Sequence, residues 1–205
     1  MLRFPHYLRR WSQLLFGLFL FGFSLAMMLR ANLGVDPWTV FADGIRVQWG
    51  FSFGWIVVVS SFVVLLIWIP LRQKPGVGTV LNALLVGPSM EVGLALVETP
   101  ETLIQRVILF AAGLLMLGIA SGLYIGARFG PGPRDGLMVG FNARFGWPMW
   151  AVRTVVETTV LAIGWALGGS FWVGTIVFAL MIGPLAQRAI KVFRVEDYSA
   201  KETGR

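Results

Sequence analysis

Arg134 and Asp135 are the charged residues of this sequence whose setting most clearly predicts chemistry. They lie in Gly132-Pro133-Arg134-Asp135-Gly136, a pattern that predicts the first turn of a helix. The free N–H groups of such a turn, the helix dipole and the guanidinium together favour a carboxylate, phosphate or sulfonate. The alternative is that Arg134 binds no solute and pairs only with Asp135 or with a lipid phosphate.

Arg153 and Glu157 form a second charged pair, inside an apolar stretch. They are four residues apart and therefore share one face of a predicted helix. Because a charge at the centre of a membrane-spanning helix costs about 2.5–3.5 kcal/mol on insertion scales, we expect the pair to face the interior of a bundle. In one interpretation, Glu157 couples a proton or cation and Arg153 holds Glu157 or a substrate anion. In the other, the two form a buried ion pair that fixes the helix register.

Two Gly-Pro pairs are expected to interrupt the helices that contain them. Gly87-Pro88 and Gly183-Pro184 occupy matching places in the two halves of the chain, and proline removes a backbone hydrogen bond. Broken helices at matching places predict a binding site near the membrane midplane, with Asn82 as a polar candidate on the first of them. The alternative is that both pairs are kinks that improve packing.

The composition predicts that these residues belong to a membrane protein. Of the 205 residues, 57% are hydrophobic and 13% are charged, which is outside the usual range of soluble domains. The chain has no cysteine, and its single histidine, His6, precedes the first apolar stretch. We therefore expect no disulfide, no metal or other cofactor, and no enzymatic activity. The net charge of +7 is spread along predicted helix ends, so no nucleic-acid partner is expected.

The second half of the sequence repeats the first at a constant offset of 96 residues. The shared positions are mostly glycine and proline, which fix backbone geometry rather than packing. They include Gly17 with Gly113, Gly34 with Gly130, Pro37 with Pro133, and the two Gly-Pro pairs. A repeated backbone plan in an apolar chain is typical of secondary transporters.

Six apolar stretches are long enough to cross a bilayer. They cover residues 11–29, 47–71, 75–97, 107–127, 148–167 and 171–190. Lysine and arginine concentrate on the side of the N-terminus, so the positive-inside rule predicts that both termini are cytoplasmic. Asp36-Pro37 and Gly132-Pro133 each predict the start of a short helix, interfacial or re-entrant, after the first and fourth spans.

The expected fold is an all-α polytopic membrane protein. Its six transmembrane helices form two inverted three-helix repeats, each with a short extra half-helix after its first span, because an odd number of spans inverts the second repeat. The expected divisions are a cytoplasmic N-terminus at 1–10, repeats at 11–98 and 99–190, and a cytoplasmic polar tail at 191–205.

Two glycine-rich faces are predicted to make close helix contacts. Gly118, Gly122 and Gly126 recur at four-residue spacing, and so do Gly164 and Gly168. Small residues let helices approach closely within a membrane. These faces predict either a contact in the core or the seam of a homodimer.

Three segments resemble a known family. The segment 74–79, followed by Asn82 and Gly87-Pro88, resembles the first motif of the YczE-type bacterial integral membrane proteins. The segment from Gly122 through Leu137 resembles the second, and Arg153, Glu157 and Gly168-Gly169 also fit. This family is similar to the wider YitT-type proteins. The resemblance spans most of residues 10–190 and implies a multi-span protein of the bacterial inner membrane. It implies no catalytic or substrate residue.

These observations favour a secondary transporter of a small anionic or zwitterionic solute. The repeat and the added charges of the second half are what point to transport, with proton coupling through Glu157 as one form of it. The alternative is a scaffold that transports nothing, or an accessory subunit of another membrane or biosynthetic system. The expected partners are the lipid bilayer and a solute that the sequence does not identify.

Overall fold

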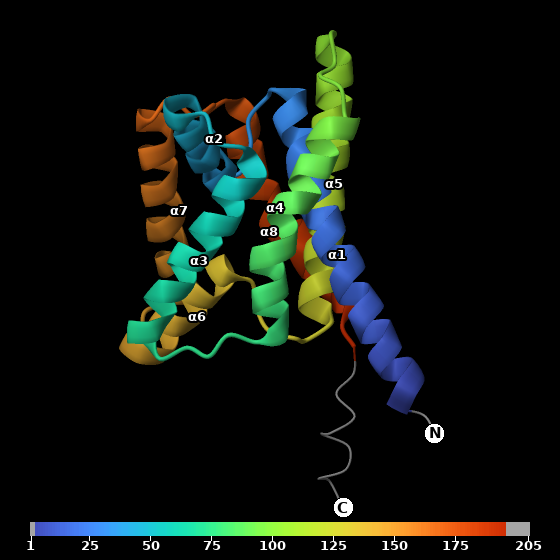
Figure 1. The fold of residues 1–205 in the computed structure, drawn as a ribbon, viewed down its shortest axis with the longest axis vertical. Helices are drawn as coiled ribbons and strands as arrows, with labels where there is room; N and C mark the ends of the chain where they lie inside the picture. Colours follow the sequence, from blue (N-terminus) through green and yellow to red (C-terminus); the bar gives the residue numbers. More distant parts are fainter. Residues whose placement is uncertain (1–2, 196–205) are drawn as a thin grey trace, which may run out of the picture.

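The computed structural model describes residues 3–195, which form eight α-helices and no strand (Figure 1). The helices are α1 (Arg3–Ala31), α2 (Pro37–Trp49), α3 (Phe53–Leu71), α4 (Val77–Leu96), α5 (Leu103–Gly126), α6 (Pro133–Phe145), α7 (Met149–Ala166) and α8 (Val173–Phe193). The all-α prediction is confirmed. Of the polar tail expected at 191–205, residues 196–205 lie outside the described residues.

Five helices are long and apolar enough to cross a membrane, namely α1, α3, α4, α5 and α8. The chain is therefore a multi-pass membrane protein. The predicted fifth span corresponds to α7, which carries Arg153 and Glu157 and is not one of the five. The ends also differ from the sequence estimate: α1 begins at Arg3, before the predicted start of the first span, and α8 continues to Phe193.

The centre of the bundle is built from α1, α4, α5 and α8. Helix α1 packs along both α5 and α4, and α5 packs along α8. Side chains between them, such as Leu18, Met90 and Leu117, are almost completely buried. The remaining helices lie around this centre, where α3 packs on α4 and α6, and α7 packs on α2 and α6.

The short helices α2 and α6 begin where the sequence predicts. Asp36 is the N-cap of α2 and accepts a hydrogen bond from the Thr39 N–H at 3.0 Å, with Pro37 at the first helical position. Gly132 and Pro133 take the same places in α6. The two helices lie towards opposite ends of the bundle, with α2 near the end away from the N-terminus and α6 near the other (Figure 1).

The loop before each short helix is bonded to the start of a long helix of the other half. The Gly78 N–H at the start of α4 donates to the Phe129 carbonyl at 2.9 Å, and the Gly174 N–H at the start of α8 donates to the Leu33 carbonyl at 2.7 Å. These four residues form two pairs at the 96-residue offset. Non-helical backbone at membrane depth is tolerated only against protein or water, and these bonds supply that protection.

The prediction that Gly-Pro pairs break two helices is wrong. Helices α4 and α8 run without interruption through Pro88 and Pro184. A proline removes one backbone hydrogen bond, and the packing of the helix outweighs that loss. Gly87 allows close packing, since a Cβ atom at this position would overlap the Gly54 carbonyl of α3. The alternative of a packing role therefore describes Gly87 better.

The glycine-rich faces make contacts within the chain. Cβ atoms added at Gly122 or Gly126 of α5 would overlap Ala189 or Phe193 of α8, and Gly164 of α7 approaches the backbone of α2 in the same way. The core contact is therefore the better interpretation. Gly122, Gly126 and Gly164 are therefore covered by neighbouring helices of the same chain.

Candidate functional site

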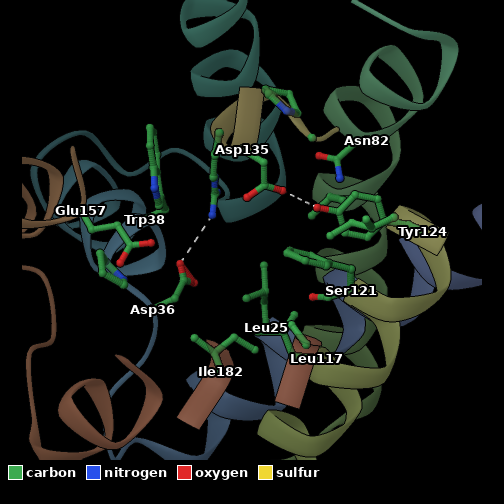
Figure 2. A pocket seen from close by; sticks show the side chains of 18 of the residues that line it. Leu25, Asp36, Trp38, Asn82, Leu117, Ser121, Tyr124, Asp135, Glu157 and Ile182 are labelled. Carbon is green, nitrogen blue, oxygen red and sulfur yellow. Dashed lines mark hydrogen bonds and ion pairs between the residues drawn. The ribbon is translucent and has the colours of Figure 1, made fainter. Parts of the chain in front are cut away.

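A cavity of about 240 Å³ lies where the two halves meet (Figure 2). The first turns of α2 and α6 border it, and side chains of α1, α3, α4, α5 and α8 form its walls. Helix α7 contributes Arg153 and Glu157. The cavity therefore lies at the boundary between the repeated segments, where the N-termini of both short helices point.

The candidate residues of the sequence come together at this cavity. Asn82, Arg134, Asp135, Arg153 and Glu157 all line it, although they lie on three different helices. Of the four predicted helix-break residues, only Gly183 lines it, whereas Gly87, Pro88 and Pro184 do not.

Arg134 lines the cavity and pairs with a carboxylate of the other half. Its guanidinium lies 3.5 Å from the Asp36 carboxylate, and its Cζ lies 4.7 Å from the centre of the Trp38 ring. Within the described residues, the guanidinium donates no hydrogen bond. Its side chain is 21% exposed, and the exposed part borders the cavity. A guanidinium has five N–H donors, so donors remain available to a bound group.

Asp36 is held in place from its own helix. Besides the N-cap bond from the Thr39 N–H, its carboxylate accepts a bond of 2.5 Å from the Thr39 hydroxyl. The side chain is only 6% exposed. This carboxylate therefore stays near the first turn of α2 and fixes one side of Arg134. Burial lowers the pKa of Arg134 and the neighbouring carboxylates of Asp36 and Asp135 oppose that shift, but an arginine side chain stays protonated in proteins.

Asp135 has a different partner from the one the sequence suggests. The Tyr124 hydroxyl of α5 donates to the Asp135 carboxylate at 2.5 Å, and Figure 2 shows Asn82 of α4 on the same side of the cavity. The alternative in which Arg134 pairs with Asp135 is therefore wrong. Each of the two neighbouring residues binds a separate helix, because adjacent positions on a helix point in different directions.

Arg153 and Glu157 form the predicted pair on α7, with 2.9 Å between the guanidinium Nε and the carboxylate. Both line the cavity. Their side chains are 44% and 24% exposed, so the pair is more open than the buried pair considered from sequence. This partial exposure leaves both groups accessible from the cavity.

Residues 8–191 match DUF6198, a family of unknown function. The chain belongs to this family. It is 37% identical to an uncharacterized protein of Haemophilus influenzae over 176 residues, which is 86% of this chain and 81% of that relative. It is 29% identical to the uncharacterized membrane protein YczE of Bacillus subtilis over 85% of this chain and 82% of the relative. The YczE-type resemblance is thus confirmed. No solved structure matches the chain.

Three residues that line the cavity were not predicted from the sequence as site residues. Asp36 was recognised only as an N-cap, and Trp38 and Tyr124 were not singled out. Trp38 stands 96 residues before Arg134, so each of these two residues contacts its counterpart in the other half. An inverted repeat with an axis through the cavity would produce such a contact, and this was the signal that could have identified Trp38.

The charges of the cavity are mixed in sign. Arg134 and Arg153 supply two positive groups, and Asp36, Asp135 and Glu157 supply three negative ones. A ligand carrying one charge of each sign would find partners for both, whereas an anion would meet the repulsion of three carboxylates. The cavity thus offers partners to groups of both signs.

Proposed function

We propose that this protein is a secondary transporter that binds a zwitterionic solute in the central cavity. The observation that carries the proposal is Arg134, whose guanidinium faces the cavity beside Asp36 and has donors to spare. An acidic group of the solute would bind there, at the N-terminus of α6, where the helix dipole adds positive potential. Its amine would lie towards Glu157 or Asp135.

The proposed architecture is six spans in two inverted repeats in the bacterial inner membrane, with both termini in the cytoplasm. The reciprocal hydrogen bonds of Leu33 with Gly174 and of Phe129 with Gly78 support an exchange symmetry between the halves. So does the placement of α2 and α6 towards opposite ends of the bundle (Figure 1). In such transporters the substrate site lies at the repeat interface, beside the N-termini of half-helices.

The two halves differ in how closely corresponding helices pack, and one of these differences supports alternating access. Helix α3 packs on α4, whereas the corresponding α7 does not pack closely on α8. We interpret the close packing of α3 on α4 as the closed side of a transport pathway. The loose packing between α7 and α8 is its open side. By the positive-inside rule the open side would face the cytoplasm.

Uptake into reconstituted vesicles tests the proposal. Purified protein in phosphatidylcholine vesicles would be screened with zwitterionic and anionic solutes, comparing the wild type with Arg134→Lys. Lysine keeps a positive charge beside Asp36 but loses the planar fork that binds an acidic group through two N–H groups, so uptake should fall. Arg188→Lys is the matched control, since this exposed arginine of α8 is not part of the cavity lining.

The result that contradicts the proposal is uptake that Arg134→Lys leaves unchanged. Vesicles that accumulate none of the solutes beyond protein-free vesicles would favour the scaffold or accessory-subunit alternative instead.

A further inference from the structure

We infer that the transported molecule is an amphiphile, whose zwitterionic head occupies the cavity while its hydrocarbon tail lies between α7 and α8. This inference rests on the proposed function and names its substrate class. A gap between these helices, the α7–α8 gap, carries the argument. It is lined by Arg153 and Glu157 on one side and by Gly183, Ala186 and Gln187 on the other.

The cavity is continuous with this gap. Helix α7 packs on α2 and α6 but not closely on α8, and of its residues only Val152 and Gly164 are buried. A Cβ atom added at Gly183 would meet nothing within 4 Å. The described residues therefore provide no close α7–α8 contact to cover this side of the cavity, and we infer that it opens towards lipid.

The corresponding gap in the first half is closed. There α3 and α4 are in contact at Gly54 and Gly87, so that a Cβ atom on either glycine would overlap the other helix. The Glu91 carboxylate of α4 also accepts a hydrogen bond of 2.5 Å from the Gly54 N–H of α3. The structure thus contains both a closed and an open version of the same pair of helices.

The sequence of the second half prevents the same closure. Trp150 stands at the position of Gly54, and Gln187 at that of Glu91. A Cβ atom at Gly54 would already overlap Glu91, so an indole at the corresponding position is incompatible with the same close contact. The Trp150 side chain is 73% exposed. The residue type at this position therefore excludes the tight arrangement seen between α3 and α4.

The chemistry of the walls matches an amphiphile. Charged groups gather near the first turns of α2 and α6 and on α7, at Arg153 and Glu157, while the α8 side of the cavity is largely apolar, with Phe178, Ile182 and Ile190. A cavity of about 240 Å³ has room for a head group but not for a long acyl chain as well. A hydrocarbon tail that remains in the membrane stays in an apolar environment. The gap therefore lets the head group bind without the free-energy cost of moving the tail out of the membrane. A small water-soluble zwitterion would need no opening towards lipid.

Because the chain has no cysteine, labelling of a single introduced one can test the inference. Ala186→Cys places a thiol on the cavity wall of α8, and Met90→Cys places one at the corresponding, fully buried position of α4. Each variant would be reconstituted in phosphatidylcholine vesicles and treated with N-ethylmaleimide. The Ala186→Cys thiol should react, and the Met90→Cys control should react far more slowly.

Two probes with the same head group then show whether the ligand is an amphiphile or a water-soluble molecule. Lysophosphatidylethanolamine carries an acyl chain, and glycerophosphoethanolamine does not. Since labelling needs the unoccupied site, a probe at about ten times its dissociation constant should slow labelling about tenfold. We expect that slowing from lysophosphatidylethanolamine, and its loss in an Ala186→Cys, Arg134→Lys double variant. An alkyltrimethylammonium of equal chain length, which lacks the acidic group, should have no effect.

Each of the other outcomes overturns the inference. Protection by glycerophosphoethanolamine at the same or a lower concentration would identify a water-soluble ligand and leave the proposed function intact. Protection by the alkyltrimethylammonium would show that the tail alone blocks the thiol. No protection by either phosphoethanolamine probe, together with uptake that does not depend on Arg134, would contradict both the inference and the proposed function.

Discussion

Arg134 and Asp36 connect the two halves of the protein through a single ion pair with little exposure. Asp36 is 6% exposed and Arg134 21% exposed, so removal of one partner leaves a poorly solvated charge behind. The sequence could place each residue at the start of a short helix, because capping is a local pattern. It could not pair them, since the pair depends on how the halves dock.

The Arg134–Asp36 pair should show energetic coupling. Arg134→Ala alone should destabilise the protein, because it leaves the Asp36 carboxylate without its charged partner. Adding Asp36→Asn should recover part of that loss, since asparagine still caps α2. We expect a coupling energy of about 1 kcal/mol or more between the two sites, as is usual for residues in contact. Thermal unfolding of the four proteins in detergent measures it, and strictly additive effects would contradict the pair.

Glu157 should control the pH dependence of transport and contribute little to folding. The pair with Arg153 lines the cavity and is only partly buried, and a carboxamide at position 157 can still accept a hydrogen bond from Arg153. Glu157→Gln keeps the shape of the side chain and removes its titration, so uptake should lose its pH dependence while the unfolding temperature stays close to that of the wild type. Ser61, which corresponds to Glu157 in the first half, offers a control through Ser61→Ala. A pH profile that persists in Glu157→Gln would exclude Glu157 as the coupling group.

At the scale of elements, the sequence predicted helix starts well and helix interruptions poorly. The N-caps of α2 and α6 follow from Asp36-Pro37 and Gly132-Pro133, because capping involves neighbouring residues only. The Gly-Pro pairs misled the prediction since the outcome depends on tertiary packing. Against α3, Gly87 permits a close crossing, and the surrounding contacts keep α4 continuous through Pro88.

Gly87 and Gly183 provide a matched test of this packing. Gly87→Ala should be destabilising, because the added Cβ would overlap the Gly54 carbonyl, and overpacking typically costs about 1–3 kcal/mol. Gly183→Ala should be neutral or stabilising by up to about 1 kcal/mol, the helix-propensity gain over glycine, since its Cβ would meet open space. The unfolding temperatures of both variants in the same detergent show whether the two substitutions differ in their effect on stability. Equal destabilisation would mean that α7 and α8 are packed together in solution, which would also close the α7–α8 gap.

At the scale of the whole molecule, the repeat in the sequence predicted equivalent elements but not their different packing. The 96-residue offset correctly relates the loop residues that bond across the halves. The tight α3–α4 contact depends on Gly54, and Trp150 stands at the corresponding position of α7, so α7 and α8 lack the small residue that the contact needs. Residues that match at the 96-residue offset show what the two halves share. The differences in helix packing appear only when the two halves are compared in the folded protein.

The orientation of the chain in the membrane gives the last prediction. With both termini in the cytoplasm and six spans, reporters fused after Gln73 and after Arg144 should read as cytoplasmic, and those after Glu101 and after Ser170 as external. The last two positions decide whether α7 crosses the membrane, because Arg144 and Ser170 flank it. A cytoplasmic reading after Ser170 would mean that α7 lies in the interface with its charges towards water, and the inverted six-span arrangement would then be wrong. If α7 does cross, Arg153 and Glu157 are carried into the membrane, where only a polar cavity can accommodate them at modest cost.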